Sequence, residues 1–592
     1  MIKFDLIVVL LVILFILISL YKDLLGTTFT FVIAVTILGF FKILTPSEIL
    51  SGFANEQIAV IILLLVLGDI IRQTAIIEVV FDRLFKSARS HRGFLGRMIL
   101  TIAGFSAFLN NTPLVAVMMP YINTWCKRNE ISPSKFLLPL SYAAILGGCA
   151  TLIGTSTNLI VNGMYIDQKI IPDAQSLNIF EFAWVGVPMI IIGFFYLVLF
   201  SDKLLPTRPD LLADFSQNSR SYIVETEIRR NSHLIGKTIS ESGFEALKGL
   251  YLIEILRDNF KISIVSPELV LQQDDLLIFA GDTQVITEML NGDSGLTLPS
   301  LGMLTKKKQT EVVEIVISHN SKMIGKSVSD IRFRARFDAA VIAIHRNGER
   351  ISGKLGDIII KAGDVLLLYT GIDFFQRSTD THDFYFISKV KDFQKIEPYK
   401  IWTLLGGTLL IILLSALHLV NLFMGLIVLL MVVIAMKIAK PKELYKAIDY
   451  NLAMIIALSL ALGTAMIKSG AADLVADVIT RLFIPIGKVG LLFGIYFITA
   501  FLAAYITNKA AVAIVFPISI MLAANLSLNP IPFVLVVSFA AAANFMTPHG
   551  YQTNLMVYGP GGYTFGNFFK IGFPLTMIYM VVTVIILRLV YL

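Results

Sequence analysis

The stretch Asn110-Asn-Thr-Pro-Leu-Val-Ala-Val-Met-Met-Pro120 decides the fold, because it sets a polar cluster inside an apolar run and then returns in altered form. Its counterpart is Ile506-Thr-Asn-Lys-Ala-Ala-Val-Ala-Ile-Val-Phe-Pro517, which lies about 395 positions downstream. In both stretches an asparagine is followed by a proline nine residues later. Paired interruptions of this kind indicate a membrane-embedded chain built from two related halves.

The repetition extends over residues 1–204 and 396–592. The recurring pairs are Pro46-x-Glu48 with Pro441-x-Glu443, Gly154…Asn158 with Gly550…Asn554, and Gly186-Val-Pro188 with Gly572-Phe-Pro574. The composition, 56% hydrophobic and 15% charged with a mean hydropathy of +0.77, is more apolar than that of a soluble chain of this size. Several runs reach the roughly 20 apolar residues that a membrane span needs. We therefore expect an α-helical polytopic membrane protein.

Each half is predicted to contain six membrane elements. They lie at 5–21, 27–44, 57–75, 94–124, 135–165 and 182–202, and again at 400–417, 419–438, 450–470, 489–523, 531–558 and 571–591. Regions 94–124 and 489–523 are centred on the two polar clusters, which lipid would not tolerate unless protein or water surrounds them. We expect each to be a re-entrant hairpin, so that each half has five transmembrane helices plus one hairpin.

An odd number of crossings would invert the second half relative to the first. Basic residues crowd segments 83–97, 127–135 and 437–446, and all three fall on the cytoplasmic side if the region between the halves is cytoplasmic. Both termini would then lie outside. The expected location is a cell membrane of the bacterial inner membrane type. The formal charge of +7 is assigned to these basic loops rather than to nucleic-acid binding.

Residues 205–395 differ from both halves because they are charged and contain short runs rich in β-branched residues. Val312–Ser318, Val341–His345 and Val365–Tyr369 are predicted strands. The segment beginning Asn231-Ser-His-Leu-Ile-Gly236 returns as Asn320-Ser-Lys-Met-Ile-Gly325. This internal repeat predicts two small α+β modules in tandem, at 205–308 and 309–395.

Both parts of the chain resemble known families. The two halves resemble the divalent anion/sodium symporter family of the ion transporter superfamily, on the stretches Asn110–Pro120, Gly147–Asn158, Ile506–Pro517 and Met546–Asn554. The insert resembles a tandem of TrkA-C (RCK C-terminal) modules without the nucleotide domain that usually precedes them, since no GxGxxG occurs in 205–395. The resemblance implies a sodium-coupled secondary transporter of a small anion, either a sulfate-like oxyanion or a di- or tricarboxylate. It also implies an elevator-type mechanism, a homodimer and regulation by a small cytosolic nucleotide ligand.

Candidate ligands follow from the chemistry of the two ions. A sodium ion (Na+) needs about five or six oxygens, so the candidate cation ligands are Ser106, Asn110, Asn111 and Gly154, with the second-half counterparts Thr507, Asn508 and Gly550. An anion needs donors and helix N-termini, so the candidate substrate-binding residues are Asn111, Thr112, Thr155, Ser156, Asn508, Lys509, Tyr551 and Gln552. The resemblance implies one cation at the first set, and the second set would hold another.

Three positions depart from the symporter pattern. Position 110 is Asn where the family has Ser, position 503 is Ala where a hydroxyl helps to bind the second cation, and position 509 is Lys where Thr or Asn is usual. The Lys509 amine has three interpretations: it takes the place of the second sodium, it pairs with the anion, or it extends out of the hairpin toward water. The motifs ending at Asn158 and Asn554 lack the Pro-Pro of the dicarboxylate branch, which leaves sulfate open.

Other functions stay open at this point. A cation/proton or arsenite antiporter of the same superfamily has the same architecture, and modules like the insert also gate ion channels. The sequence has no TVGYG-type filter, and its paired interrupted helices favour a transporter over a channel. No constellation typical of an enzyme is found. The identity of the anion, sodium or proton coupling, symport or exchange, and the regulatory ligand are not fixed by the sequence.

Overall fold

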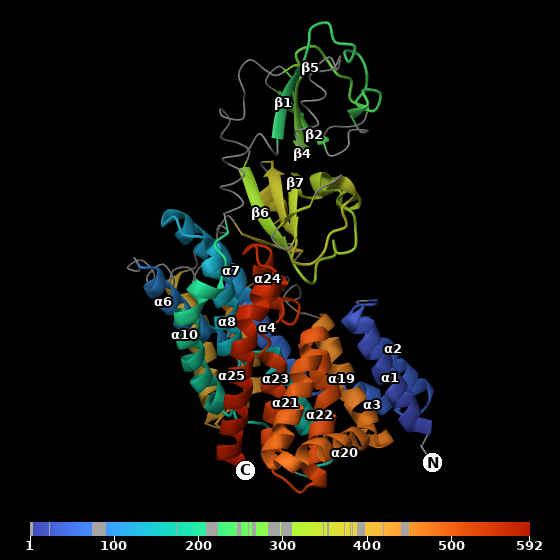
Figure 1. Cartoon of the computed structure of the whole chain (residues 1–592), viewed down its shortest axis with the longest axis vertical. Coiled ribbons are helices and arrows are strands. Elements are labelled where there is room, and N and C mark those ends of the chain that lie inside the picture. Colours follow the sequence, from blue (N-terminus) through green and yellow to red (C-terminus); the bar gives the residue numbers. More distant parts are fainter. Residues whose placement is uncertain are drawn as a thin grey trace.

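The computed structural model describes residues 4–22, 24–73, 90–172, 174–208, 223–244, 250–257, 260–262, 268–281, 296–297, 311–346, 349–351, 355–371, 373–378, 381, 383–387, 397–417, 419–439, 444, 448 and 450–592. Its helices form one body, and two β-sheets lie beyond one end of that body (Figure 1). Seven of the described helices are long and apolar enough to cross a membrane. The chain is therefore a predominantly helical, polytopic membrane protein.

The helices of the two halves follow one another in the same order. The first half contains α1 (Phe4–Tyr21), α2 (Thr27–Phe40), α3 (Pro46–Ser51), η1 (Gly52–Ala54), α4 (Glu56–Gln73), α6 (His91–Ser106), α7 (Asn111–Arg128), η2 (Pro133–Lys135), α8 (Leu137–Gly148), α9 (Ser156–Asp167) and α10 (Ala183–Leu204). The second half contains α16 (Pro398–Ala416), α17 (Leu422–Ala435), α19 (Tyr450–Ser469), α20 (Ala471–Phe483), η7 (Ile484–Ile486), α21 (Lys488–Tyr505), α22 (Asn508–Asn525), α23 (Ile531–Ala542), α24 (Gln552–Tyr558) and α25 (Phe565–Tyr591).

The helix breaks lie where the polar clusters predict them. Region 94–124 divides into α6 and α7 around residues 107–110, and region 489–523 divides into α21 and α22 at residues 506–507. Side-chain caps set the new starts: Asn110 accepts a hydrogen bond from the backbone N–H of Thr112 at 3.4 Å, and Thr507 accepts one from Ala510 at 3.3 Å. Regions 135–165 and 531–558 are likewise interrupted, between α8 and α9 and between α23 and α24.

Two features differ from the sequence prediction. Residues 471–483 form a separate helix, α20, because Gly470 adopts a φ of 78° and turns the chain away from α19. The predicted span 27–44 ends as a helix at Phe40, since Lys42 has a φ of 58°. Parts of the predicted basic segments, at 83–89, 440–443 and 445–447, lie outside the described residues, as do the module boundaries near 308 and 395.

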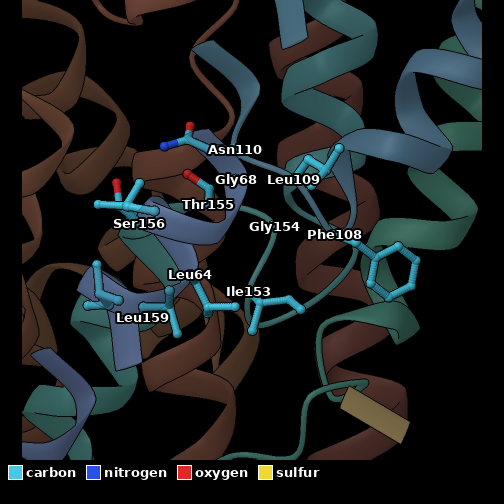
Figure 2. Close-up of a pocket in the computed structure, with 12 residues that line it drawn as sticks. Leu64, Gly68, Phe108, Leu109, Asn110, Ile153, Gly154, Thr155, Ser156 and Leu159 are labelled. Atoms are coloured by element: carbon cyan, nitrogen blue, oxygen red, sulfur yellow. The ribbon is translucent and has the colours of Figure 1, made fainter. Parts of the chain in front are cut away.

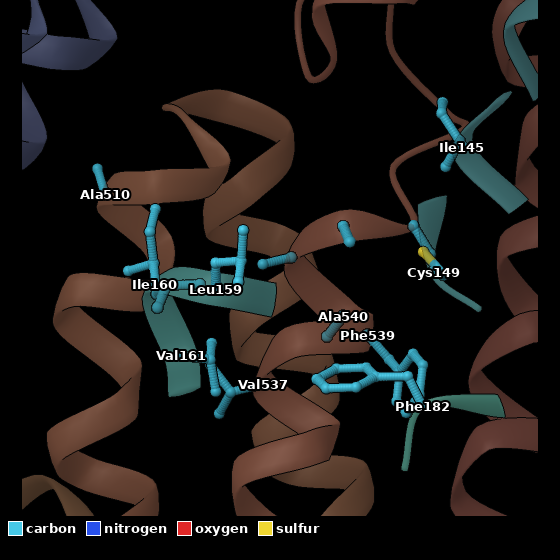
Figure 3. Close-up of a cluster of buried hydrophobic side chains, with 14 of the residues drawn as sticks. Ile145, Cys149, Leu159, Ile160, Val161, Phe182, Ala510, Val537, Phe539 and Ala540 are labelled. Carbon is cyan, nitrogen blue, oxygen red and sulfur yellow. The ribbon is translucent and has the colours of Figure 1, made fainter. Parts of the chain in front are cut away.

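The two halves share one hydrophobic core. Helix α9 of the first half packs against α22 and α23 of the second half. Figure 3 shows Leu159 and Ile160 of α9 near Ala510 of α22 and Val537 of α23, all of them buried. The interrupted helices of one half are therefore fixed by the other half.

The insert contains two five-stranded sheets, and their strand orders match when the second is read in the reverse direction. The first has the order β3-β2-β4-β1-β5, built from β1 (Ile223–Ile228), β2 (Leu250–Arg257), β3 (Phe260–Ile262), β4 (Leu276–Gly281) and β5 (Leu296–Thr297). The second has the order β10-β6-β9-β7-β8, built from β6 (Glu311–Ile317), β7 (Ala339–Arg346), β8 (Glu349–Arg350), β9 (Val365–Thr370) and β10 (Phe384–Phe386), with the short helices α13 (Val328–Ile331), α14 (Phe333–Phe337) and α15 (Phe374–Ser378). The three predicted strands are confirmed as β6, β7 and β9.

Each sheet carries the same ion pair, in which the carboxylate is buried. Arg257 donates two hydrogen bonds of 2.8 Å to the Asp275 carboxylate, and Arg346 donates two of 2.7 Å to Asp364. The side-chain hydrogen bonds to Asp364 raise the pKa of Arg346 above its ordinary value. Bidentate pairs of this kind join strand to turn with fixed geometry. Their recurrence indicates that the two modules share one local design.

Candidate functional site

The tip between α6 and α7 places an asparagine where two hydrogen-bonding networks meet. The Asn111 side chain is 1% exposed, and its Oδ1 accepts a hydrogen bond of 2.6 Å from the Ser106 hydroxyl. The same hydroxyl lies 2.8 Å from the carbonyl oxygen of Ala144 on α8. The Asn111 Nδ2 donates to the hydroxyl of Tyr551 at 2.6 Å. One side chain therefore offers an oxygen on one side and a donor on the other.

The start of α24 meets the start of α7. Tyr551 precedes α24, and its hydroxyl lies 3.0 Å from the Thr155 hydroxyl as well as accepting the bond from Asn111. Gln552, the first residue of α24, accepts a hydrogen bond of 3.0 Å from Thr112 through its Oε1. The structure thus brings together first-half and second-half residues that are 440 positions apart in the sequence.

The loop between α8 and α9 is held by a buried asparagine that the sequence analysis did not single out as a functional residue. The Asn158 Nδ2 donates to the carbonyl oxygens of Thr151 at 2.8 Å and Gly148 at 3.3 Å. Its Oδ1 accepts a hydrogen bond of 2.8 Å from Ser538 on α23. The Thr151 hydroxyl in turn accepts one of 3.1 Å from the Gly154 N–H. The backbone around Gly154 is therefore fixed by a residue of the other half.

The loop between α23 and α24 repeats this arrangement with the halves exchanged. The Asn554 Nδ2 donates to the carbonyl oxygens of Asn544 at 3.0 Å and Thr547 at 3.1 Å, and its Oδ1 accepts a hydrogen bond of 2.7 Å from Ser141 on α8. The Gly550 N–H donates to the Thr547 hydroxyl at 3.1 Å. A sequence signal existed for these serines, because Ser141-Tyr-Ala-Ala returns as Ser538-Phe-Ala-Ala.

A pocket lies beside the first tip, and its walls differ in chemistry. Helix α4 contributes an apolar wall that includes Leu64 and Gly68, whereas Asn110, Thr155 and Ser156 supply polar groups (Figure 2). None of the described residues that line the pocket carries a carboxylate. Neutral oxygens suit an alkali cation, and hydroxyl and amide donors suit an oxyanion. The predicted residues Asn110, Gly154, Thr155 and Ser156 are thus gathered around one pocket.

The second-tip candidates occupy the start of α22. Thr507 caps that helix, and Asn508 and Lys509 are its first two residues, all three half-buried. The Oδ1 of Asn508 accepts no hydrogen bond from the described residues. Gly550 lies buried in the loop before α24. The structure therefore places Thr507, Asn508 and Lys509 at a helix start equivalent to that of α7, but with a different hydrogen-bonding pattern.

Comparison with known proteins gives a consistent result. The model of the citrate transporter family CitMHS matches residues 9–487 and 408–592. The chain is 34% identical to the putative sulfur deprivation response regulator of Chlamydomonas reinhardtii, covering 92% of this chain and 94% of that one. It is 33% identical to an uncharacterized transporter of Synechocystis, covering 95% and 93% of the two chains. It is 30% identical to sodium/sulfate cotransporter 1 of Chlamydomonas reinhardtii over 59% of this chain and 41% of that protein.

Proposed function

The chain belongs to the citrate transporter family, and on that premise we propose that it is a sodium-coupled secondary transporter of a small anion, with sulfate the first candidate. The family and the names of the relatives indicate a transporter and not an enzyme. The observation that carries the proposal is the contact of Asn111 with both Ser106 and Tyr551, at the meeting point of the two halves. Citrate and other di- or tricarboxylates are the alternative substrates.

The site chemistry supports coupling between a cation and an anion. The Asn111 carbonyl oxygen and the Ser106 hydroxyl offer cation ligands, while Thr112, Thr155 and the start of α9 offer donors to an anion. A cation bound at the tip would lower the cost of bringing a dianion into an apolar surround. The same hydrogen-bonded group would therefore serve both ions.

We propose an elevator-type movement of two inverted repeats. The polar starts of α7 and α9 face the apolar wall of α4, so a body carrying the polar groups could slide past α4 without leaving charges unpaired. The start of α1 and the end of α25 lie on the side away from the sheets (Figure 1). This arrangement supports a cytoplasmic insert with both termini outside. The homodimer and the bacterial inner membrane location stay predictions.

The contacts of the second module support regulation through the insert. Asn123 of α7 donates to the carbonyl oxygen of Ile387 at 3.4 Å, and β10 contacts α7. A Cβ atom at Gly559, just after α24, would lie 2.5 Å from the carbonyl oxygen of Gly363 and 2.6 Å from Val365 Cγ2. The module therefore touches both elements whose other ends carry the site, α7 and α24. Its assignment as a TrkA-C module and its nucleotide ligand stay predictions.

Flux measurements test the proposal. Purified protein in proteoliposomes should accumulate radiolabelled sulfate under an inward sodium gradient, with saturation, and citrate or succinate should compete if carboxylates bind. Replacing sodium by choline should reduce the rate. Uptake of none of these anions would refute the proposed function, and large currents without saturation would indicate a channel instead.

A further inference from the structure

Three side-chain amides lie at the starts of α7 and α24, and the oxygen of each one already accepts a hydrogen bond within the protein. The Oδ1 of Asn110 accepts the backbone N–H of Thr112 at 3.4 Å, and the Oδ1 of Asn111 accepts the Ser106 hydroxyl at 2.6 Å. The Oε1 of Gln552 accepts the Thr112 hydroxyl at 3.0 Å. The acceptor end of each amide is therefore in use.

Two of these amides keep donor hydrogens for which the described residues offer no acceptor. Asn111 uses one of its two Nδ2 hydrogens for the Tyr551 hydroxyl, and the Nε2 of Gln552 donates to none of the described residues. Asn111 is buried and Gln552 is half-buried. Buried donors in proteins are normally paired, so hydrogens left over at this point indicate a ligand that accepts them.

A pair of hydroxyls supplies one more donor hydrogen at the same point. The hydroxyls of Tyr551 and Thr155 lie 3.0 Å apart, and the Tyr551 oxygen also accepts the bond from Asn111. Two hydroxyls that share one hydrogen bond have two hydrogens, so one of them stays available whichever group donates. Thr155 lines the same pocket as Asn110 (Figure 2). This donor therefore lies beside a space that a ligand can enter.

A site that offers donors and has its amide oxygens occupied distinguishes oxyanions by their protons. Sulfate and selenate carry no proton at pH 8, so each of their oxygens can accept a hydrogen bond. Phosphate and arsenate keep a proton at that pH, and this proton needs an acceptor. A carboxylate would serve, but none of the described residues that line the pocket carries one. An O–H left unpaired in a buried site lowers affinity about tenfold to a hundredfold.

We propose that Gln552, held by Thr112, makes the site select fully ionised oxyanions over protonated ones. Because the Gln552 oxygen is fixed on the Thr112 hydroxyl, the amide presents its Nε2 hydrogens to the anion. Thr112 is in this respect a positioning residue, since it acts through Gln552. The inference rests on the proposed anion transport and narrows its substrate class to oxyanions without protons, such as sulfate.

Competition between oxyanions of matched shape tests the inference. Uptake of radiolabelled sulfate into proteoliposomes is measured at pH 8 against unlabelled selenate, phosphate and arsenate. All four are tetrahedral and mainly dianionic at this pH, so the comparison isolates the proton. Selenate should compete about as well as unlabelled sulfate. Phosphate and arsenate should each require at least about a tenfold higher concentration.

Variants of the two residues separate positioning from damage to the fold. Thr112→Val keeps the shape and removes the donor, so the Gln552 amide can turn and offer its oxygen, and the preference for selenate over arsenate should fall toward parity. Thr112→Ser keeps a hydroxyl and should keep the preference. Gln552→Glu adds a carboxylate acceptor and should shift the preference toward arsenate. Anion-dependent rises in melting temperature give the same ratios for a variant that no longer transports.

The outcomes separate this inference from the proposed function. Competition by phosphate and arsenate as strong as that by selenate, or an unchanged preference in Thr112→Val and Gln552→Glu, overturns the inference while the proposed transport stands. Uptake of carboxylates with no competition from any of the four oxyanions also overturns it, and leaves the carboxylate alternative. Uptake of no anion at all overturns the inference and the proposed function together.

Discussion

Replacing Asn111 by alanine should lower transport far more than it lowers the free energy of unfolding. The substitution removes two hydrogen bonds of 2.6 Å, one from Ser106 and one to Tyr551. Neither partner is left alone, because Ser106 keeps the carbonyl oxygen of Ala144 and Tyr551 keeps Thr155. At about 1 kcal/mol for each bond, the free energy of unfolding should fall by about 2 kcal/mol.

The transport defect should be much larger than the loss of stability. Asn111 is proposed to contact both the cation, through Oδ1, and the anion, through Nδ2. A hydrogen bond or ligand to a charged partner contributes about 1.5–3 kcal/mol. Losing two such contacts amounts to at least about 3 kcal/mol, which lowers uptake at limiting sulfate and sodium about a hundredfold or more.

A matched control separates site chemistry from folding. Asn162 on α9 is also fully buried, with its Oδ1 accepting a hydrogen bond of 2.9 Å from the Leu177 N–H and its Nδ2 donating to Ser176 at 3.1 Å. Asn162→Ala should lose similar stability yet keep most of its uptake. Radiolabelled sulfate flux in proteoliposomes, beside melting temperatures of both variants, gives the comparison. Near-normal uptake by Asn111→Ala, or equal loss of uptake in both variants, would refute the reasoning.

Three further predictions address the tips and the insert. Gly148→Ala should raise the sodium concentration for half-maximal uptake at least tenfold, because the new Cβ would lie 2.7 Å from the Asn111 Oδ1. The control Gly104→Ala should leave that concentration unchanged, because a Cβ there would have no atom within 4 Å. Lys509→Ala should weaken anion affinity by about 1–3 kcal/mol in competition assays. If the KM for the anion and the sodium Hill slope both stay unchanged, the lysine only extends toward water. Gly559→Ala should push the insert away from the end of α24, because the new Cβ would lie 2.5 Å from the carbonyl oxygen of Gly363. The sulfate uptake rate should change, and an unchanged rate would argue against coupling through this contact.

Much of the fold could be predicted from local patterns. Polar clusters inside apolar runs mark helix breaks, because buried backbone groups need caps, and both Asn110 and Thr507 act as caps. Alternating β-branched runs predicted β6, β7 and β9 for the same local reason. Helix α20 was not predicted because the sequence analysis assigned only runs long enough to span a membrane, and this helix has 13 residues, including Asp473 and Arg481.

The candidate site was predictable in its residues but not in its partners. The repeat pointed to Asn111, Thr155 and Tyr551 as separate candidates, and the structure joins them in one network. A sequence repeat shows which positions correspond, but it does not show which side chain fills a space.

The crossed asparagine–serine bonds explain why the two halves must act together. A buried amide in an apolar bundle is costly unless its groups are satisfied. Among the described residues, Asn158 Oδ1 accepts its hydrogen bond from Ser538, and Asn554 Oδ1 accepts one from Ser141, so each broken helix depends on the opposite half. Asn111 also reaches Tyr551 across the same boundary. In the proposed site, a cation that draws the Asn111 oxygen would therefore reorient the amide that meets the anion. Under this proposal, coupling between the ions would follow from the shared geometry of one side chain, while the serine bonds hold the two loops in place.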